Sequence, residues 1–105
     1  ASSPRASDLA APGAGELLAP GLYAVVSPID GIFYRRSSPT APPCVGEGET
    51  IETGHHLGLI EAMKSFNAVL YGGPGLPARA IIVEARAADA AEVRQGAVLF
   101  VVRAS

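Results

Sequence analysis

The sequence predicts an all-β domain, and three observations support this fold class. Short apolar runs alternate with glycine- and proline-rich breaks from residue 23 onward, which favours strands and turns over helices. No apolar run approaches the roughly 18 residues that a membrane helix requires. One spaced pattern of apolar residues and glycine also occurs twice, which predicts two similar halves that bury their apolar faces on each other.

Seven segments have the composition of strands. Each is short, contains β-branched or aromatic residues, and ends near a turn-forming residue such as Pro28, Gly54 or one of the residues 72–77. The segments are Tyr23–Ser27, Gly31–Arg35, Thr50–Ile51, Leu57–Glu61, Ser65–Leu70, Ala80–Glu84 and Val98–Arg103. We interpret 72–77 as a turn that joins the two halves, since it lacks the glycine spacing of a phosphate-binding loop.

The repeated pattern has an apolar residue, a glycine and a leucine at intervals of three. It reads Ile51-x-x-Gly54-x-x-Leu57 in the first half and Val93-x-x-Gly96-x-x-Leu99 in the second. We interpret each copy as a strand end, a glycine where the turn needs a positive φ, and a strand that begins with a core leucine.

Two regions lack a clear strand pattern. Residues 1–22 are rich in Ala, Ser, Pro and Gly, and they are expected to form a flexible linker before a domain that covers 23–105. The alanine-rich stretch Ala85–Gln95 is expected to be a long loop, with room for one helical turn.

Composition and single residues exclude several classes of function. A net charge of −2 does not favour binding to nucleic acid or to an anionic membrane. Cys44 is the only cysteine, so no internal disulfide can form; we expect a buried, inert thiol and a reducing compartment. His55 and His56 are neighbours that would point to opposite faces of a strand, so no metal site is expected.

Lys64 is the only lysine, while the other seven basic residues are arginines. A lysine amine can lose its proton and be acylated, whereas arginine stays charged near neutral pH. Lys64 follows Glu61-Ala62-Met63 and lies between two predicted strands, so Ala62 to Ser65 should form a hairpin turn. Met63 and Lys64 are poor residues for the positive φ angles of such a turn, and a local rule broken in this way indicates a functional site.

The Glu61-Ala62-Met63-Lys64 sequence resembles the attachment sequence of biotinyl domains, above all those of the biotin carboxyl carrier proteins of acetyl-CoA carboxylase. The resemblance includes the upstream pattern that ends in Ile60, the downstream Asn67, and the stretch from Ser27 to Arg35. It covers about Tyr23 to Arg103, which is most of the chain.

The resemblance implies a fold and a function. The fold would be a flattened β-barrel or sandwich of two four-stranded antiparallel sheets with quasi-twofold symmetry. Lys64 would hold biotin through an amide, Glu61, Ala62 and Met63 would serve recognition and presentation, and residues 36–43 would form the protruding "thumb" that can contact biotin. The protein would be a non-catalytic carrier.

The resemblance also implies partners. A biotin protein ligase would modify Lys64, and the carried carboxyl group would pass from biotin carboxylase to carboxyltransferase, with acetyl-CoA converted to malonyl-CoA for fatty acid synthesis. We expect a cytoplasmic protein, with a plastid or another organelle left open. Whether a region that precedes Ala1 makes the full protein oligomeric is also left open.

The chain departs from the family pattern at three places, and two alternative functions stay open. Ser65 stands where the family usually has methionine or another hydrophobe, a change that bears on how efficiently biotin is carboxylated or recognised more than on the fold. The turn 72–77 and the loop 85–95 are longer than usual, and both lie away from the attachment hairpin, so we expect them to change loops. One alternative is a lipoyl domain of a 2-oxoacid dehydrogenase, although those domains typically have Asp before the lysine and Ala after it. The other is an assembly module of the same fold in which Lys64 is unmodified.

Overall fold

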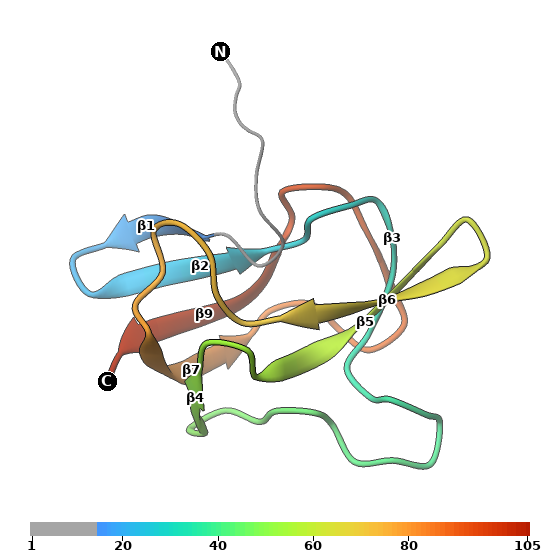
Figure 1. Ribbon diagram of the computed structural model, residues 1–105, viewed down its shortest axis with the longest axis horizontal. Coiled ribbons are helices and arrows are strands. Elements are labelled where there is room, and N and C mark those ends of the chain that lie inside the picture. The colour runs from blue at the N-terminus through green and yellow to red at the C-terminus, as the bar shows by residue number, and fades with distance from the viewer. Residues whose placement is uncertain (1–14) are drawn as a thin grey trace.

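The computed structural model describes residues 15–105, with side chains from Pro20 onward, as an all-β domain (Figure 1). In chain order the strands are β1 (Gly15–Ala19), β2 (Leu22–Val26), β3 (Gly31–Tyr34), β4 (Thr50–Glu52), β5 (His56–Ala62), β6 (Ser65–Leu70), β7 (Arg79–Ala85), β8 (Ala91–Val93) and β9 (Val98–Ala104). The predicted fold class is confirmed. Within residues 15–105 there is no helix of the length and apolarity needed to cross a membrane.

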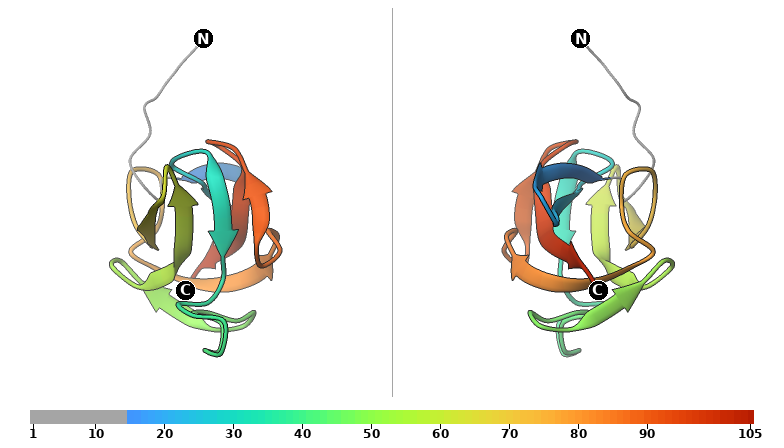
Figure 2. Two further views of the ribbon diagram at one scale, coloured as in Figure 1. Left: turned by 90° about the vertical axis from the view of Figure 1, so that its right-hand side faces the viewer. Right: turned by 90° about the vertical axis from the view of Figure 1, so that its left-hand side faces the viewer.

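Two antiparallel sheets face each other across the core (Figure 2). Their strand orders are β1-β2-β9-β7-β4 and β6-β5-β3-β8. Without β1, these are the two four-stranded sheets that the resemblance implies. The β5–β6 hairpin projects at one end of the long axis in Figure 1, and the C-terminus lies at the opposite end.

The pairing pattern has the expected quasi-twofold symmetry. Strand β9 lies between β2 and β7 in one sheet, just as β5 lies between β6 and β3 in the other. The short strand β4 pairs with β7, and the short strand β8 pairs with β3. The first half, β2–β5, is therefore equivalent to the second half, β6–β9, strand by strand. If each strand is replaced by its equivalent, the strand order of one sheet becomes that of the other.

The repeated pattern found in the sequence has the same structure in both halves. Its first apolar residue is buried in a short edge strand, and its leucine is completely buried at the start of a long strand. Its glycine has a φ of 93° in the first copy and 89° in the second, a conformation that side chains disfavour. The equivalent pairs are Ile51 and Val93, Gly54 and Gly96, and Leu57 and Leu99.

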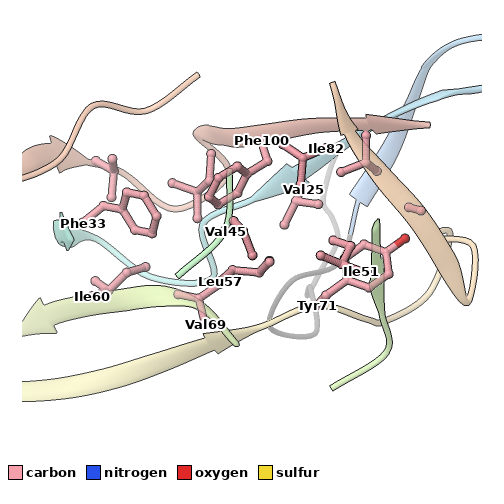
Figure 3. Close-up of a cluster of buried hydrophobic side chains, with 14 residues drawn as sticks. Val25, Phe33, Val45, Ile51, Leu57, Ile60, Val69, Tyr71, Ile82 and Phe100 are labelled. Atoms are coloured by element: carbon pink, nitrogen blue, oxygen red, sulfur yellow. The ribbon is translucent and has the colours of Figure 1, made fainter. Parts of the chain in front are cut away.

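The core lies between the two sheets and receives side chains from both (Figure 3). Phe33 of β3 and Phe100 of β9 meet edge to face, with ring centroids 5.9 Å apart and planes at 82°. Both are fully buried, as are Leu57, Ile60 and Val102. Each such side chain contributes about 1.5–3 kcal/mol on burial, so this cluster is the main source of the stability that positions the hairpin.

All seven predicted strands are present, and none of their ends differs by more than one residue from the prediction. Two strands were not predicted. The first is β1, which lies in the expected linker 1–22; its backbone pairs with β2 from Gly15↔Val25 to Ala19↔Leu22. Backbone pairing needs no buried apolar stripe, so the composition gave no sign of it. The linker prediction is corrected for residues 15–22, and its residues 1–14 lie outside the described part.

The second unpredicted strand is β8, which lies in the expected long loop Ala85–Gln95. Ala91 pairs with Phe33 and Val93 pairs with Gly31, so only residues 86–90 connect β7 to β8. These connecting residues contain no helix. Alanine and glutamate have weak strand propensity, and here the pairing with β3 overrides it.

Tyr71 closes the connection between β6 and β7. It follows β6, is only 1 % exposed, and its hydroxyl group donates a hydrogen bond of 2.6 Å to the Pro77 carbonyl across the glycine-rich turn. Burial raises the pKa of the Tyr71 hydroxyl to about 12. The interpretation of 72–77 as the turn between the halves is wrong. This turn links β6 of one sheet to β7 of the other, and both strands belong to the second half, β6–β9; the halves meet at the turn of Met63 and Lys64 instead.

Tyr71→Phe should lower the free energy of unfolding at pH 7 by about 1 kcal/mol, because the Pro77 carbonyl loses its donor. The wild-type phenol is neutral when folded, and its pKa lies above the unfolded value of about 10. Its contribution is therefore complete below pH ~10 and is lost as the pH rises from about 10 towards 12. Urea unfolding of both proteins over this range should show a steeper decline for wild type; identical slopes would contradict this account.

Candidate functional site

The site is built on the hairpin of β5 and β6. Ala62 pairs with Ser65 across the end of the two strands, and Glu61 pairs with Phe66 behind them. This register leaves Met63 and Lys64 as the two residues of the turn. The structure therefore brings Glu61, Ala62, Met63 and Lys64 together at the tip of the hairpin, as the sequence predicts.

Both turn residues have the left-handed backbone conformation. The φ angles are 52° at Met63 and 66° at Lys64, and Ala90 is the only other non-glycine residue with positive φ in the described range. Two-residue hairpin turns that follow the twist of the strands require this conformation, and Asn-Gly is the usual solution. A methionine and a lysine here cost about 1–2 kcal/mol each, so the chain retains them against its local preference.

The Lys64 side chain is exposed at the tip, beside a Met63 that is 97 % exposed. Among the described residues, none forms a salt bridge or side-chain hydrogen bond with the Lys64 amine. An amine that is exposed at a projecting end is accessible to the active site of another protein. The site thus suits modification of Lys64 and presentation of the product.

Glu61 and Ala62 lie at the base of the turn and are both half-buried. The Tyr34 hydroxyl group on the neighbouring strand β3 donates a hydrogen bond of 3.0 Å to Glu61 Oε1. This hydrogen bond, as the main cause, raises the pKa of Tyr34. The centroid of the Tyr34 ring also lies 6.1 Å from that of the Phe66 ring. These contacts connect β3, β5 and β6 on the outer face of the sheet, just below the turn.

Residues 36–43, the predicted thumb, form a loop that leaves the end of β3 and returns before β4. Its base is closed by a bridge between Arg36 and Pro43 and by a hydrogen bond of 2.7 Å from the Cys44 amide to the Arg35 carbonyl. Within it, Arg36 Nη1 donates to the Ala41 carbonyl at 2.9 Å. The loop is thus closed at its base, while its tip residues 37–40 are exposed.

A hollow of about 330 Å³ separates the thumb from the outer face of the sheet. Tyr34, Leu59 and Phe66 form its sheet side, and residues 36–39 form its thumb side. Asp89, from the connection between β7 and β8, completes the lining. The lining of the hollow is therefore mainly apolar, with polar and charged side chains on its thumb side.

Sequence reasoning identified the thumb side of this hollow, within residues 36–43, but missed its sheet side and Asp89. The exposed aromatic Phe66, two positions after the lysine, was a usable signal. Asp89 gave none, because its hydrogen bond to Arg35, just before the thumb, brings together residues 54 positions apart. The expectation that the long 85–95 loop would affect loops only is therefore incomplete, since Asp89 lines the hollow.

His55 and His56 have separate partners. His55 Nε2 lies 3.7 Å from Glu49 Oε2, whereas His56 Nδ1 lies 3.6 Å from Cys44 Sγ. Within the described residues, no three His, Cys, Asp or Glu side chains are grouped so that they could hold a metal ion. The Cys44 thiol is half-buried, and burial raises its pKa, which disfavours the reactive thiolate.

The fold and the hairpin together define a domain that presents a modifiable lysine at a tight turn, and comparison with known proteins narrows this class. No family model matches the chain. It is 47 % identical over 45 residues to the biotin carboxyl carrier protein of acetyl-CoA carboxylase of Cyanidium caldarium, a match that covers 43 % of this chain and 30 % of that protein. It is 34 % identical over 82 residues to the chloroplastic carrier protein 1 of Arabidopsis thaliana, covering 78 % of this chain and 28 % of that protein.

A solved structure is also similar. A single-chain, multi-domain long-chain acyl-CoA carboxylase matches with a TM-score of 0.65 and 25 % identity, over 90 % of this chain and 8 % of that one. The chain thus spans less than a third of the length of the proteins named here. The predicted resemblance is confirmed: the chain is similar to biotin carboxyl carrier proteins of acetyl-CoA carboxylase.

Met63→Asn should raise the free energy of unfolding by about 1 kcal/mol, because asparagine tolerates positive φ better than methionine. Met63→Ala is the matched control: it removes the same exposed side chain but keeps the backbone penalty, so its stability should stay within about 0.5 kcal/mol of wild type. Urea denaturation of the three proteins measures both effects. An equal gain in both variants would show that the turn conformation is not the cause.

Proposed function

We propose that this domain is a biotin carboxyl carrier that holds biotin as an amide on Lys64. The observation on which this depends most is the single lysine of the chain, exposed at the tip of a two-residue turn with unfavourable φ angles. The similarity to carrier proteins of acetyl-CoA carboxylase supports biotin as the group attached.

Presentation is the task of the protein in this proposal. A biotin protein ligase supplies biotinyl-adenylate, whose carboxyl carbon the neutral Lys64 amine attacks; an amide bond forms, AMP leaves, and the amine releases a proton. The bound biotin supplies a ring nitrogen that can be carboxylated, which no side chain offers. The domain contributes no catalytic group to either step; Glu61, Ala62 and Met63 hold the turn in the shape that the ligase recognises.

The thumb and the hollow beside it suit the head group of biotin. Its bicyclic ring has an apolar thiophane part and a polar ureido part, and the hollow has a mainly apolar lining with some polar groups on its thumb side. Leu59 and Phe66 would contact the former, while Arg36 and Ser37 offer hydrogen-bond donors to the ureido oxygen. We therefore propose that residues 36–43 act as the thumb of a biotinyl domain.

The proposed partners are the ligase, a biotin carboxylase and a carboxyltransferase, with acetyl-CoA as the final acceptor and malonyl-CoA for fatty acid synthesis as the product. A carrier must enter two active sites, so we propose that the segment before β1 acts as a tether that raises the local concentration of the carried group. The single half-buried Cys44 suits a reducing compartment, and we propose the cytoplasm or a plastid.

Two alternatives use the same fold. A lipoyl domain would have lipoic acid on Lys64, but Met63 and Ser65 flank the lysine where lipoyl domains typically have Asp and Ala, and the thumb adds to this difference. An unmodified assembly module would need no accessible lysine. The strained turn argues against the unmodified module, and the similarity to biotin carriers favours biotin over lipoate.

The full chain should gain the mass of one biotin when it is incubated with a biotin protein ligase, biotin and ATP. Lys64→Arg should gain none, because arginine keeps the charge at the tip but cannot be acylated. Intact mass spectrometry measures both, and circular dichroism confirms that the variant is folded. A folded wild-type chain that gains no mass would refute the proposal, and a gain with lipoate and its ligase instead would identify the lipoyl alternative.

A further inference from the structure

Asp89 connects the second half of the chain to the base of the thumb. It lies in the short connection 86–90 between β7 and β8. Its Oδ1 accepts a hydrogen bond of 2.8 Å from the Arg35 amide, and its Oδ2 lies 3.6 Å from Arg36 Nε. Arg35 and Arg36 are the first residues after β3, so one carboxylate contacts the point at which the thumb leaves the sheet.

The contact continues across the thumb. The Arg36 guanidinium group that faces Asp89 also donates through Nη1 to the Ala41 carbonyl at 2.9 Å. Ala41 lies on the returning side of the loop, close to Pro43, which bridges to Arg36. The interactions from Asp89 to Arg36 and from Arg36 to Ala41 therefore connect both sides of the thumb. Loss of the Asp89 carboxylate would remove one of the two partners of the Arg36 side chain.

The connection that contains Asp89 is itself held in place. The Ala90 amide donates to the Phe33 carbonyl at 2.7 Å, and Phe33 belongs to the core. Ala90 has a φ of 63°, which is unfavourable for alanine, so the surrounding contacts impose this conformation. Asp89 is therefore held in place by the contacts of its neighbour Ala90 and by the strand β8 that follows, although it lies in a connection between strands.

The two interactions of Asp89 differ in strength. The Arg36 and Asp89 side chains are 40 % and 41 % exposed, so their ion pair is screened by solvent and by salt. The hydrogen bond to the Arg35 amide is short and involves a charged acceptor, and such bonds are about twice as strong as neutral ones. Asparagine could retain this hydrogen bond but not the ion pair, whereas alanine loses both.

We propose that Asp89 is a positioning residue that holds the thumb, residues 36–43, in the place where it forms the hollow with Tyr34, Leu59 and Phe66. Its role for the carried group rests on the proposed function, because the hollow is where the head group of biotin would be held. Positioning of the thumb itself does not depend on modification of Lys64. The two parts can therefore be tested separately.

The first test measures amide hydrogen exchange by NMR in the unmodified full chain. Asp89→Ala should accelerate exchange of the Cys44 amide, which bonds to Arg35, by about tenfold. Asp89→Asn should give a smaller acceleration, of about threefold or less. Glu84→Ala is the matched control, because it removes an exposed carboxylate from an ion pair with Arg86 without touching the thumb, and exchange at Cys44 should not change.

Exchange at core amides decides whether the effect is local. Ile60 and Val69, on the paired strands β5 and β6, should exchange at the wild-type rate in Asp89→Ala. Acceleration of these amides to the same degree would indicate general destabilisation and would overturn the proposal. Exchange at Cys44 within about twofold of wild type in Asp89→Ala would overturn it as well.

The second test uses the ligase-treated proteins. Wild type and Asp89→Ala should be biotinylated on Lys64 at rates within about twofold of each other, since the hairpin is untouched. Biotinylation should then slow exchange of the Cys44 amide in wild type. This slowing should be absent in Asp89→Ala and present in Asp89→Asn. Absence of biotinylation in wild type would refute the proposed function alone. Equal protection in all three proteins would overturn the role of Asp89 towards the carried group.

Discussion

The register between β5 and β6 is the constraint on which the site depends. Ala62 opposes Ser65, so Met63 and Lys64 alone form the turn. Because strand side chains alternate between two faces, a slip of either strand by one residue would remove Lys64 from the tip and turn Ile60 of β5 or Val69 of β6 away from the core. Burial of these two residues against Leu57 and Phe33 therefore fixes the position of the lysine.

The core and the site have different requirements, which the fold satisfies separately. The sheets bury their apolar faces in one cluster, and the hairpin extends beyond it with an exposed tip. The cost of two positive φ angles is confined to that tip, where stability from the core can offset it. The Tyr34 hydrogen bond to Glu61 connects the tip to β3, so the turn is supported by the sheet although it makes few contacts itself.

The sequence predicted those features that depend on local pattern. Alternating apolar residues and the turns at Gly54 and Gly96 determine the strands and the two similar halves, and the hairpin follows from the two runs that flank Lys64. The features it did not predict depend on pairing between distant residues. Strand β1 is a backbone pairing with β2, and β8 contains alanine and glutamate, so neither has the composition of a strand.

The hollow beside the thumb shows the same limit. Its sheet side follows from the strand pattern, because Tyr34, Leu59 and Phe66 lie on neighbouring strands. Its closure by Asp89 requires the close approach of the 86–90 connection to the end of β3, a contact that no local pattern signals.

The central claim is that the position of the lysine in the turn, and not merely its presence, makes it a modification site. The most direct test exchanges the two turn residues in the double variant Met63→Lys, Lys64→Met, which keeps the composition, the single lysine and the hairpin. Treated with a biotin protein ligase, biotin and ATP, this variant should show less than about one hundredth of the wild-type rate of mass gain, because the amine then leaves the tip in a different direction. Modification of the exchanged lysine at the wild-type rate would contradict the account.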